Sequence, residues 1–151
     1  MRDREGAQGR SEALILHLPD RAREEIEDGV READVREACG LLLGRRVGET
    51  LEIARAVHLE NAAAPSEADR FCISPGEHAR WDLWAKRAGM AVVGVWHSHP
   101  SGPGWPSRAD RAGGVEGWSH LIAAPGEGSF LALRSWRMVG GEFLEELLLS
   151  R

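Results

Sequence analysis

The sequence predicts a single domain of the α/β class. The chain has 151 residues, a length that suits one domain with one hydrophobic core. Apolar segments of strand length alternate along it with segments whose apolar residues recur at helical spacing. Two cysteines, Cys39 and Cys72, are too few for a disulfide scaffold, and neither lies in a C-x-x-C pair typical of a structural zinc finger. This cysteine content fits a reducing cytoplasm.

Composition excludes further classes of protein. The first eleven residues, MRDREGAQGRS, are polar and charged, which does not match a signal peptide, and no apolar run approaches the length of a membrane span. We expect residues 1–11 to be a disordered tail and residues 12–151 to form the domain. The net charge of −5 argues against nucleic acid as the main partner, because backbone recognition needs a basic surface.

The first half of the chain predicts three strands and two helices. Alternating leucines indicate a strand over 13–18, and a helix over 19–31 follows that would bury Ala22, Ile26 and Val30. Apolar and alternating segments indicate strands over 39–45 and 50–59, joined by a turn at 47–49. A helix over 75–88 begins with Ser74 as its N-cap, and its apolar face consists of Trp81, Trp84 and Ala85.

The second half predicts more strands around an irregular, glycine-rich region. A β-branched segment at 90–96 indicates a central strand, and segments 119–124 and 130–139 indicate two more. Segment 143–149 fits either a strand or a short helix. Nine of the 18 glycines lie between Gly89 and Gly128, and loops held in fixed shapes beside a rigid sheet are where catalytic chemistry usually lies.

The stretch HSHPSGPGWPSRAD, residues 97–110, directly follows the central strand. Side chains alternate along a strand, so His97 and His99 point the same way, about 6 to 7 Å apart at the backbone. Two imidazoles so placed can bind one metal ion. Zinc accepts nitrogen and carboxylate ligands, and a loop rich in proline and glycine can return Asp110, the natural third ligand, to the histidines.

Parts of this pattern also have explanations that involve no metal or catalysis. Ser107 followed three residues later by Asp110 also fits a capping box at a helix start, which needs no catalytic role. Four further histidines have no partner at ligand spacing and are expected to be ordinary surface or core residues: His17, His58, His78 and His120.

Together, His97, Ser98, His99, Pro100, Ser107 and Asp110 resemble the metal signature of the JAMM, or MPN-plus, metalloproteases. Glu37, in EACGLLLG, matches the Glu-x-x-Gly-Leu pattern of small bacterial members of that family. The resemblance implies that His97, His99 and Asp110 ligate Zn²⁺, that Glu37 is the general base for the attacking water, and that Ser107 helps to hold the oxyanion.

The resemblance also implies a fold and an activity. The fold is similar to that of cytidine deaminases, a mixed, curved sheet flanked by helices with zinc at one end of the central strands. The activity is hydrolysis of an amide or isopeptide bond that follows the C-terminal tail of a ubiquitin-like or sulfur-carrier protein. Such a tail could bind as an added strand beside the sheet.

Two alternative functions belong to other classes. One is a binding module that keeps the MPN fold without peptidase activity, although such modules usually lack ligands that are present here. The other is a relative associated with DNA repair, because HSHPSG also resembles the motif of that branch; the acidic balance of charge argues against it.

Overall fold

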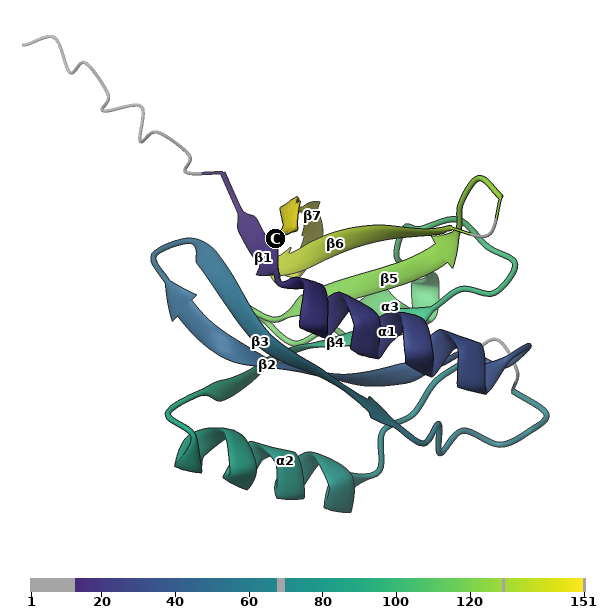
Figure 1. The fold of residues 1–151 in the computed structure, drawn as a ribbon, viewed down its shortest axis with the longest axis horizontal. Helices are drawn as coiled ribbons and strands as arrows, with labels where there is room; N and C mark the ends of the chain where they lie inside the picture. The colour runs from purple at the N-terminus through teal and green to yellow at the C-terminus, as the bar shows by residue number, and fades with distance from the viewer. Residues whose placement is uncertain (1–12, 68–69, 129, 151) are drawn as a thin grey trace, which may run out of the picture.

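Eight strands form one curved sheet of mixed direction in the computed structural model, which describes residues 13–67, 70–128 and 130–150 (Figure 1). The predicted tail 1–11 lies outside the described residues. Among them, no helix is both long enough and apolar enough to cross a membrane. The elements, in chain order, are β1 (Ile15–Leu18), α1 (Asp20–Ala33), β2 (Cys39–Val47), β3 (Thr50–Leu59), α2 (Pro75–Arg87), β4 (Ala91–Ser98), α3 (Arg108–Ala112), β5 (Ser119–Pro125), β6 (Leu131–Val139), β7 (Glu142–Glu145) and β8 (Leu147–Ser150).

The sheet has the strand order β7-β6-β5-β4-β2-β3-β1-β8. Strands β4 and β5 are parallel, as are β1 and its two neighbours, and the other pairs are antiparallel. The register of β2 shifts near Gly44, where an added Cβ would lie 2.0 Å from the carbonyl oxygen of Glu52. Such a bulge bends its strand, so it contributes to the curvature. The predicted fold class, a mixed curved sheet flanked by helices, is confirmed.

Helix α1 packs on one face of the sheet. Its buried residues are Ala22, Ile26 and Gly29, whereas Val30, which was expected to be buried, is only partly covered. Gly29 lies over the ring of Trp96: an added Cβ would stand 2.7 Å from that ring. The helix runs two residues beyond the predicted end and stops at Asp34, whose φ of 55° is incompatible with a continuing helix.

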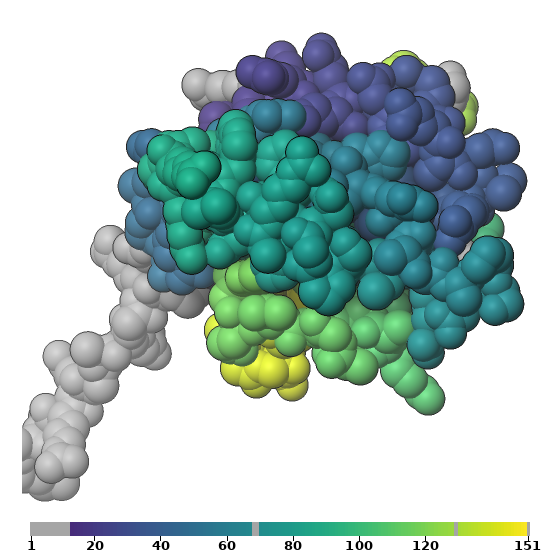
Figure 2. Space-filling model, turned by 90° about the horizontal axis from the view of Figure 1, so that it is seen from below, coloured from purple at the N-terminus to yellow at the C-terminus, as the bar shows by residue number. Residues whose placement is uncertain are grey.

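Helix α2 covers the opposite face, and its teal atoms lie on the side of the molecule turned to the viewer in Figure 2. Ser74 caps it as predicted, since its hydroxyl accepts a hydrogen bond from the Glu77 amide. The predicted apolar face is partly wrong. Ala85 is buried and Trp81 half-buried, but Trp84 is 41% exposed, because it lies at the margin, edge-on to Trp81 and below the Arg55 guanidinium.

The end of the chain brings the two edges of the sheet together. Segment 143–149, which fits either a strand or a helix by pattern, forms parts of two strands, β7 and β8, which lie at opposite edges and are separated in sequence by Glu146 alone. The Glu146 carboxylate accepts hydrogen bonds from Ser135 and Arg137 of β6, and Arg137 also donates to the Ile15 carbonyl. A buried ion pair therefore connects β6 with the strands at the other edge.

Candidate metal centre

His97 and His99 come from the end of the central strand β4. The side chain of Trp96 points to the α1 face and packs in the core there, so His97, the next residue, points to the other face. His97 is fully buried and stacks on Phe71, with ring centroids 4.4 Å apart. His99 lies at the rim, with its side chain 13% exposed, and its amide donates to the Ala123 carbonyl of β5. The strand thus presents one imidazole deep and one at the surface.

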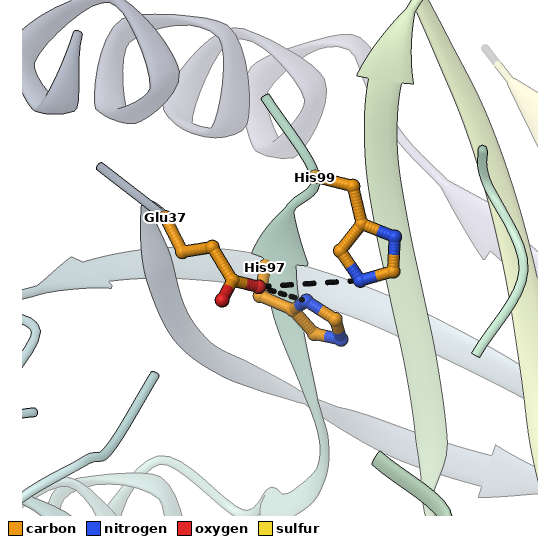
Figure 3. Close-up of side chains that lie close together, drawn as sticks. All are labelled: Glu37, His97 and His99. Carbon is orange, nitrogen blue, oxygen red and sulfur yellow. Dashed lines mark ion pairs between the residues drawn. The ribbon is translucent and has the colours of Figure 1, made fainter. Parts of the chain in front are cut away.

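Glu37 reaches the histidines from the start of β2. The hydroxyl of Ser98 accepts a hydrogen bond from the amide of Ala38, and the Asn61 side chain donates to the Glu37 carbonyl. These bonds fix the backbone that carries the carboxylate, which is almost fully buried. Its Oε1 lies 3.4 Å from Nδ1 of His97 and 4.0 Å from Nε2 of His99. Figure 3 marks both ion pairs with dashed lines.

Asp110 has the geometry of both of its predicted roles. The Ser107 hydroxyl accepts from the Asp110 amide at 3.1 Å, and Oδ2 of Asp110 accepts from the Ser107 amide at 2.8 Å, so the capping box of α3 is formed. The same carboxylate faces the histidines: Oδ1 lies 3.4 Å from Nε2 of His97 and Oδ2 lies 3.4 Å from Nε2 of His99. The cap therefore orients the carboxylate toward both imidazoles.

Charge and hydrogen bonds set the protonation of the histidine and carboxylate groups of this cluster. Nδ1 of His99 lies 2.8 Å from the Pro103 carbonyl, which can only accept, so Nδ1 carries a proton and Nε2 is the ring nitrogen that faces Asp110. Hydrogen bonding to Asp110 raises the pKa of His99, against the effect of burial. Burial alone would raise the pKa of Asp110, but His99, His97 and Ser107 together hold it well below its usual value. Asp110 is therefore a carboxylate at neutral pH.

Unsatisfied polar atoms gather at this cluster. Among the described residues, seven buried side-chain nitrogen and oxygen atoms have no hydrogen-bond partner. Four of them belong to Glu37 (Oε2), His97 (Nδ1 and Nε2) and His120 (Nδ1). Each such atom costs about 1–3 kcal/mol if it stays unpaired. A concentration of them on histidine and carboxylate side chains fits a site that a metal ion completes.

The distances between donor atoms fit zinc as well. With zinc–nitrogen and zinc–oxygen bonds of about 2.0–2.1 Å, two ligands of a tetrahedral site lie about 3.3 Å apart. Oδ1 of Asp110 lies 3.4 Å from Nε2 of His97, and Oδ2 lies 3.4 Å from Nε2 of His99. Each spacing is close to that of two neighbouring zinc ligands, and the two spacings run through different oxygens of the same carboxylate. Ligand atoms of Glu37, His97 and His99 also lie within 4.8 Å of one another.

His120, which was expected to be an ordinary surface or core residue, is buried beside the cluster. Potential ligand atoms of His97, Asp110 and His120 all lie within 4.8 Å of one another. Burial, together with the charge of His97, lowers the pKa of His120 to about 4, so its imidazole is neutral at neutral pH. The sequence offers no motif for it, because His120 comes from β5 and reaches the site only through the parallel pairing of β4 with β5.

Two cavities meet at the cluster. One, of about 470 Å³, is lined by Val35, His99, Trp105 and the prolines of the loop, and the other, of about 370 Å³, by Phe71, Cys72, Asp110 and His120 among others. Glu37 and Ser107 line both. A peptide that crosses from one cavity to the other therefore passes the carboxylate of Glu37 and the hydroxyl of Ser107.

Comparison with known proteins gives a family. Residues 19–139 match the model of prokaryotic homologs of the JAB domain. A protein of Thermus thermophilus described as a "Probable TtuB-protein conjugate cleaving protease" is 30% identical over 107 residues, which are 71% of this chain and 68% of that protein.

Solved structures share the fold. A protein of Desulfitobacterium hafniense superposes with a TM-score of 0.80 at 28% identity, over 90% of this chain and 92% of that one. A protein of Salinibacter ruber superposes with a TM-score of 0.66 at 24% identity, over 89% and 90% of the two chains. The second likeness concerns the fold alone.

Proposed function

The chain belongs to the family of prokaryotic homologs of the JAB domain, and from this premise we propose that it is a zinc metallopeptidase. The family assignment confirms the resemblance to small bacterial JAMM proteins. The bond cleaved is an amide or isopeptide bond at the C-terminal tail of a ubiquitin-like or sulfur-carrier protein. The observation that carries the proposal is the convergence of His97, His99 and Asp110 beside Glu37, at the junction of two cavities.

His97, His99 and Asp110 are the residues that hold the metal. Their orientation is imposed by the chain: strand β4 places His97, the Pro103 carbonyl sets the tautomer of His99, and the capping box turns the carboxylate of Asp110 inward. When bound, zinc supplies a Lewis acid and lowers the pKa of a coordinated water to about 7.

Glu37 is the proton carrier of the proposed reaction. Its carboxylate takes a proton from water as the oxygen of that water forms a bond to the carbonyl carbon. The carbon–nitrogen bond then breaks, and the same proton passes from Glu37 to the leaving amine. Burial of Glu37 and the hydrogen bonds around it at Ser98 and Asn61 hold the carboxylate in one place for both transfers.

Ser107 is placed to stabilise the negative charge that develops on the carbonyl oxygen. Its oxygen already accepts a hydrogen bond from the Asp110 amide, which leaves the hydroxyl proton free to donate. Ser107 lines both cavities, so that proton can reach a carbonyl bound between them. One such donor is typically worth about 100- to 1000-fold in rate.

The substrate class rests on the family resemblance and on the printed name of the relative from Thermus thermophilus, which describes cleavage of TtuB-protein conjugates. The apolar, proline-lined cavity beside His99 suits an extended tail with small residues next to the cleaved bond. Trp105, half-exposed at its edge, provides a flat apolar surface for the tail.

The test of the mechanism compares two matched variants. Glu37→Gln removes the proton carrier and keeps the size of the side chain, while Glu52→Gln makes the same change on an exposed position of β3. The probe is a ubiquitin-fold carrier joined to its target by an isopeptide bond. Glu37→Gln should bind zinc as before and lose cleavage, and Glu52→Gln should retain both zinc and cleavage. An unchanged rate for Glu37→Gln would refute the mechanism.

Zinc content and DNA binding separate the two alternatives. Purified protein should contain one equivalent of zinc that His97→Ala removes, whereas a binding module without a metal should contain none. Retention on DNA that falls steeply with salt would instead favour a relative associated with DNA repair.

A further inference from the structure

Three imidazoles follow one another inward from the rim of the site. His99 is at the rim, His97 is fully buried beside it with ring centroids 4.9 Å apart, and His120 lies beyond His97 with centroids 6.1 Å apart. In the parallel register His120 pairs with Val95, two residues before His97, and therefore lies on the same face of the sheet. Asp110 is close to all three rings.

Among the described residues, nothing gives the His120 imidazole a hydrogen-bonding role. It is 4% exposed, it meets the edge of the Phe143 ring, and its Nδ1 has no hydrogen-bond partner. A buried, unpartnered imidazole nitrogen is costly, and packing alone would be served better by an apolar ring. Asp110 and His120 line the same cavity, so the imidazole of His120 lies beside open space next to the Asp110 carboxylate.

We propose that His120 is an additional metal ligand, and that His97, Asp110 and His120 form a second, deeper set of ligands. The inference rests on the metal centre of the proposed function. The two sets share His97 and Asp110, and they differ in whether the third ligand is His99 at the rim or His120 in the interior. Ligand atoms within 4.8 Å need only small side-chain rotations to reach one ion.

The deeper set has a consequence for metal retention. His99 follows the last residue of β4 and lines the cavity proposed for the substrate tail together with the loop after it, whereas His120 lies within β5. A metal that loses His99 therefore keeps three protein ligands. Without His120, loss of His99 would leave only His97 and Asp110 as protein ligands, and the metal would be released.

The experiment removes the two histidines separately and together. His99→Ala, His120→Phe and the double variant are loaded with zinc, and the dissociation constant is measured by competition with a chelator. His120→Phe keeps an aromatic ring against Phe143, and His17→Phe on β1 is the matched control. X-ray absorption at the zinc edge counts the imidazoles bound in each protein.

We expect His99→Ala to keep zinc with two imidazoles, from His97 and His120. The double variant His99→Ala with His120→Phe should bind zinc through one imidazole. Its zinc affinity should fall by more than about 10- to 100-fold, the loss typical when a residue that only hydrogen-bonds to a metal ligand is removed. His120→Gln, which keeps a hydrogen-bonding group, should lose the imidazole as well. His17→Phe should change neither quantity.

The inference would be overturned if, in the His99→Ala background, the zinc affinity and the number of bound imidazoles were the same with and without His120. The proposed function would then remain intact. Wild-type protein that binds no zinc would overturn both. Circular dichroism and thermal unfolding of the zinc-free variants establish that each is folded, and His120→Gln gives the same comparison if His120→Phe is not.

Discussion

Replacing Arg137 with Met should strongly destabilise the protein although it leaves the candidate metal centre untouched. The Arg137 side chain is 2% exposed and that of Glu146 is fully buried, and Nη2 of the arginine lies 2.6 Å from Oε2 of the glutamate. Arg137 also donates to the backbone carbonyls of Glu49 and Ile15. Arg137→Met removes all of these bonds and leaves the carboxylate of Glu146 buried with a hydrogen bond from Ser135 as its remaining side-chain partner.

The expected loss follows from that uncompensated charge. Breaking a buried ion pair by removing one partner costs about 3–5 kcal/mol, and unpaired carbonyls add to this. For a chain of this length, the melting temperature should fall by about 6–20 °C. Urea unfolding followed by circular dichroism measures the free energy, and thermal unfolding measures the shift.

The double variant Arg137→Met with Glu146→Leu is the control. With both charges gone, the apolar pair should recover at least half of the loss, because no charge is left buried alone. Zinc content should be the same in wild-type protein and both variants. A loss below about 1 kcal/mol in the free energy of unfolding for Arg137→Met, or no recovery in the double variant, would refute the view that this ion pair holds the two edges of the sheet together.

Three further predictions test the site and the core. Ser107→Ala should lower kcat by about 100- to 1000-fold with zinc content unchanged, because the Ser107 amide that holds Asp110 remains, and Ser107→Thr should recover much of the rate. Burial raises the pKa of the Cys39 thiol from its ordinary 9.0 to about 12. Between pH 9.0 and about pH 12 the thiol is therefore ionised in the unfolded chain and protonated in the folded protein, so the free energy of unfolding falls as the pH rises. Between about pH 8 and about pH 10, the free energy of unfolding measured with urea should fall by about 1 kcal/mol in the wild-type protein and should not show this fall in Cys39→Ala. Equal falls in both proteins would contradict the prediction. Gly29→Ala should destabilise by about 1–3 kcal/mol through contact with Trp96, whereas Gly76→Ala, where the added carbon meets nothing within 4 Å, should not destabilise.

The sequence predicts most strands and helices because each has a local signal. The run of apolar residues from Cys39 indicates a strand buried on both faces, and Ser74 with Pro75 marks a helix start. The exposure of Trp84 differs from the prediction because helical spacing identifies a face but not its width. Segment 143–149 is ambiguous by pattern because its two short strands pair with different partners, β6 and β1, and β1 lies at the far end of the sequence.

The candidate ligands are recognisable because three of them lie within fourteen residues, in a spacing that a strand and a short loop convert into proximity. Asp110 illustrates the limit of pattern alone: the capping box and the ligand role look like alternatives, and the structure accommodates both with one carboxylate. Asn61 has no recognisable signal in the sequence because its effect on Glu37 passes through a backbone carbonyl.

Local signals along the chain were thus sufficient to predict most strands and helices and the main candidate ligand set, since strand alternation, caps and close spacing act over a few residues. Only the tertiary structure decided which distant groups join them. The pairing of β4 with β5 brings His120 beside His97, and the closure of the sheet buries Arg137 against Glu146. Such contacts depend on strand order and register, which are properties of the whole sheet and have no counterpart in the spacing of residues.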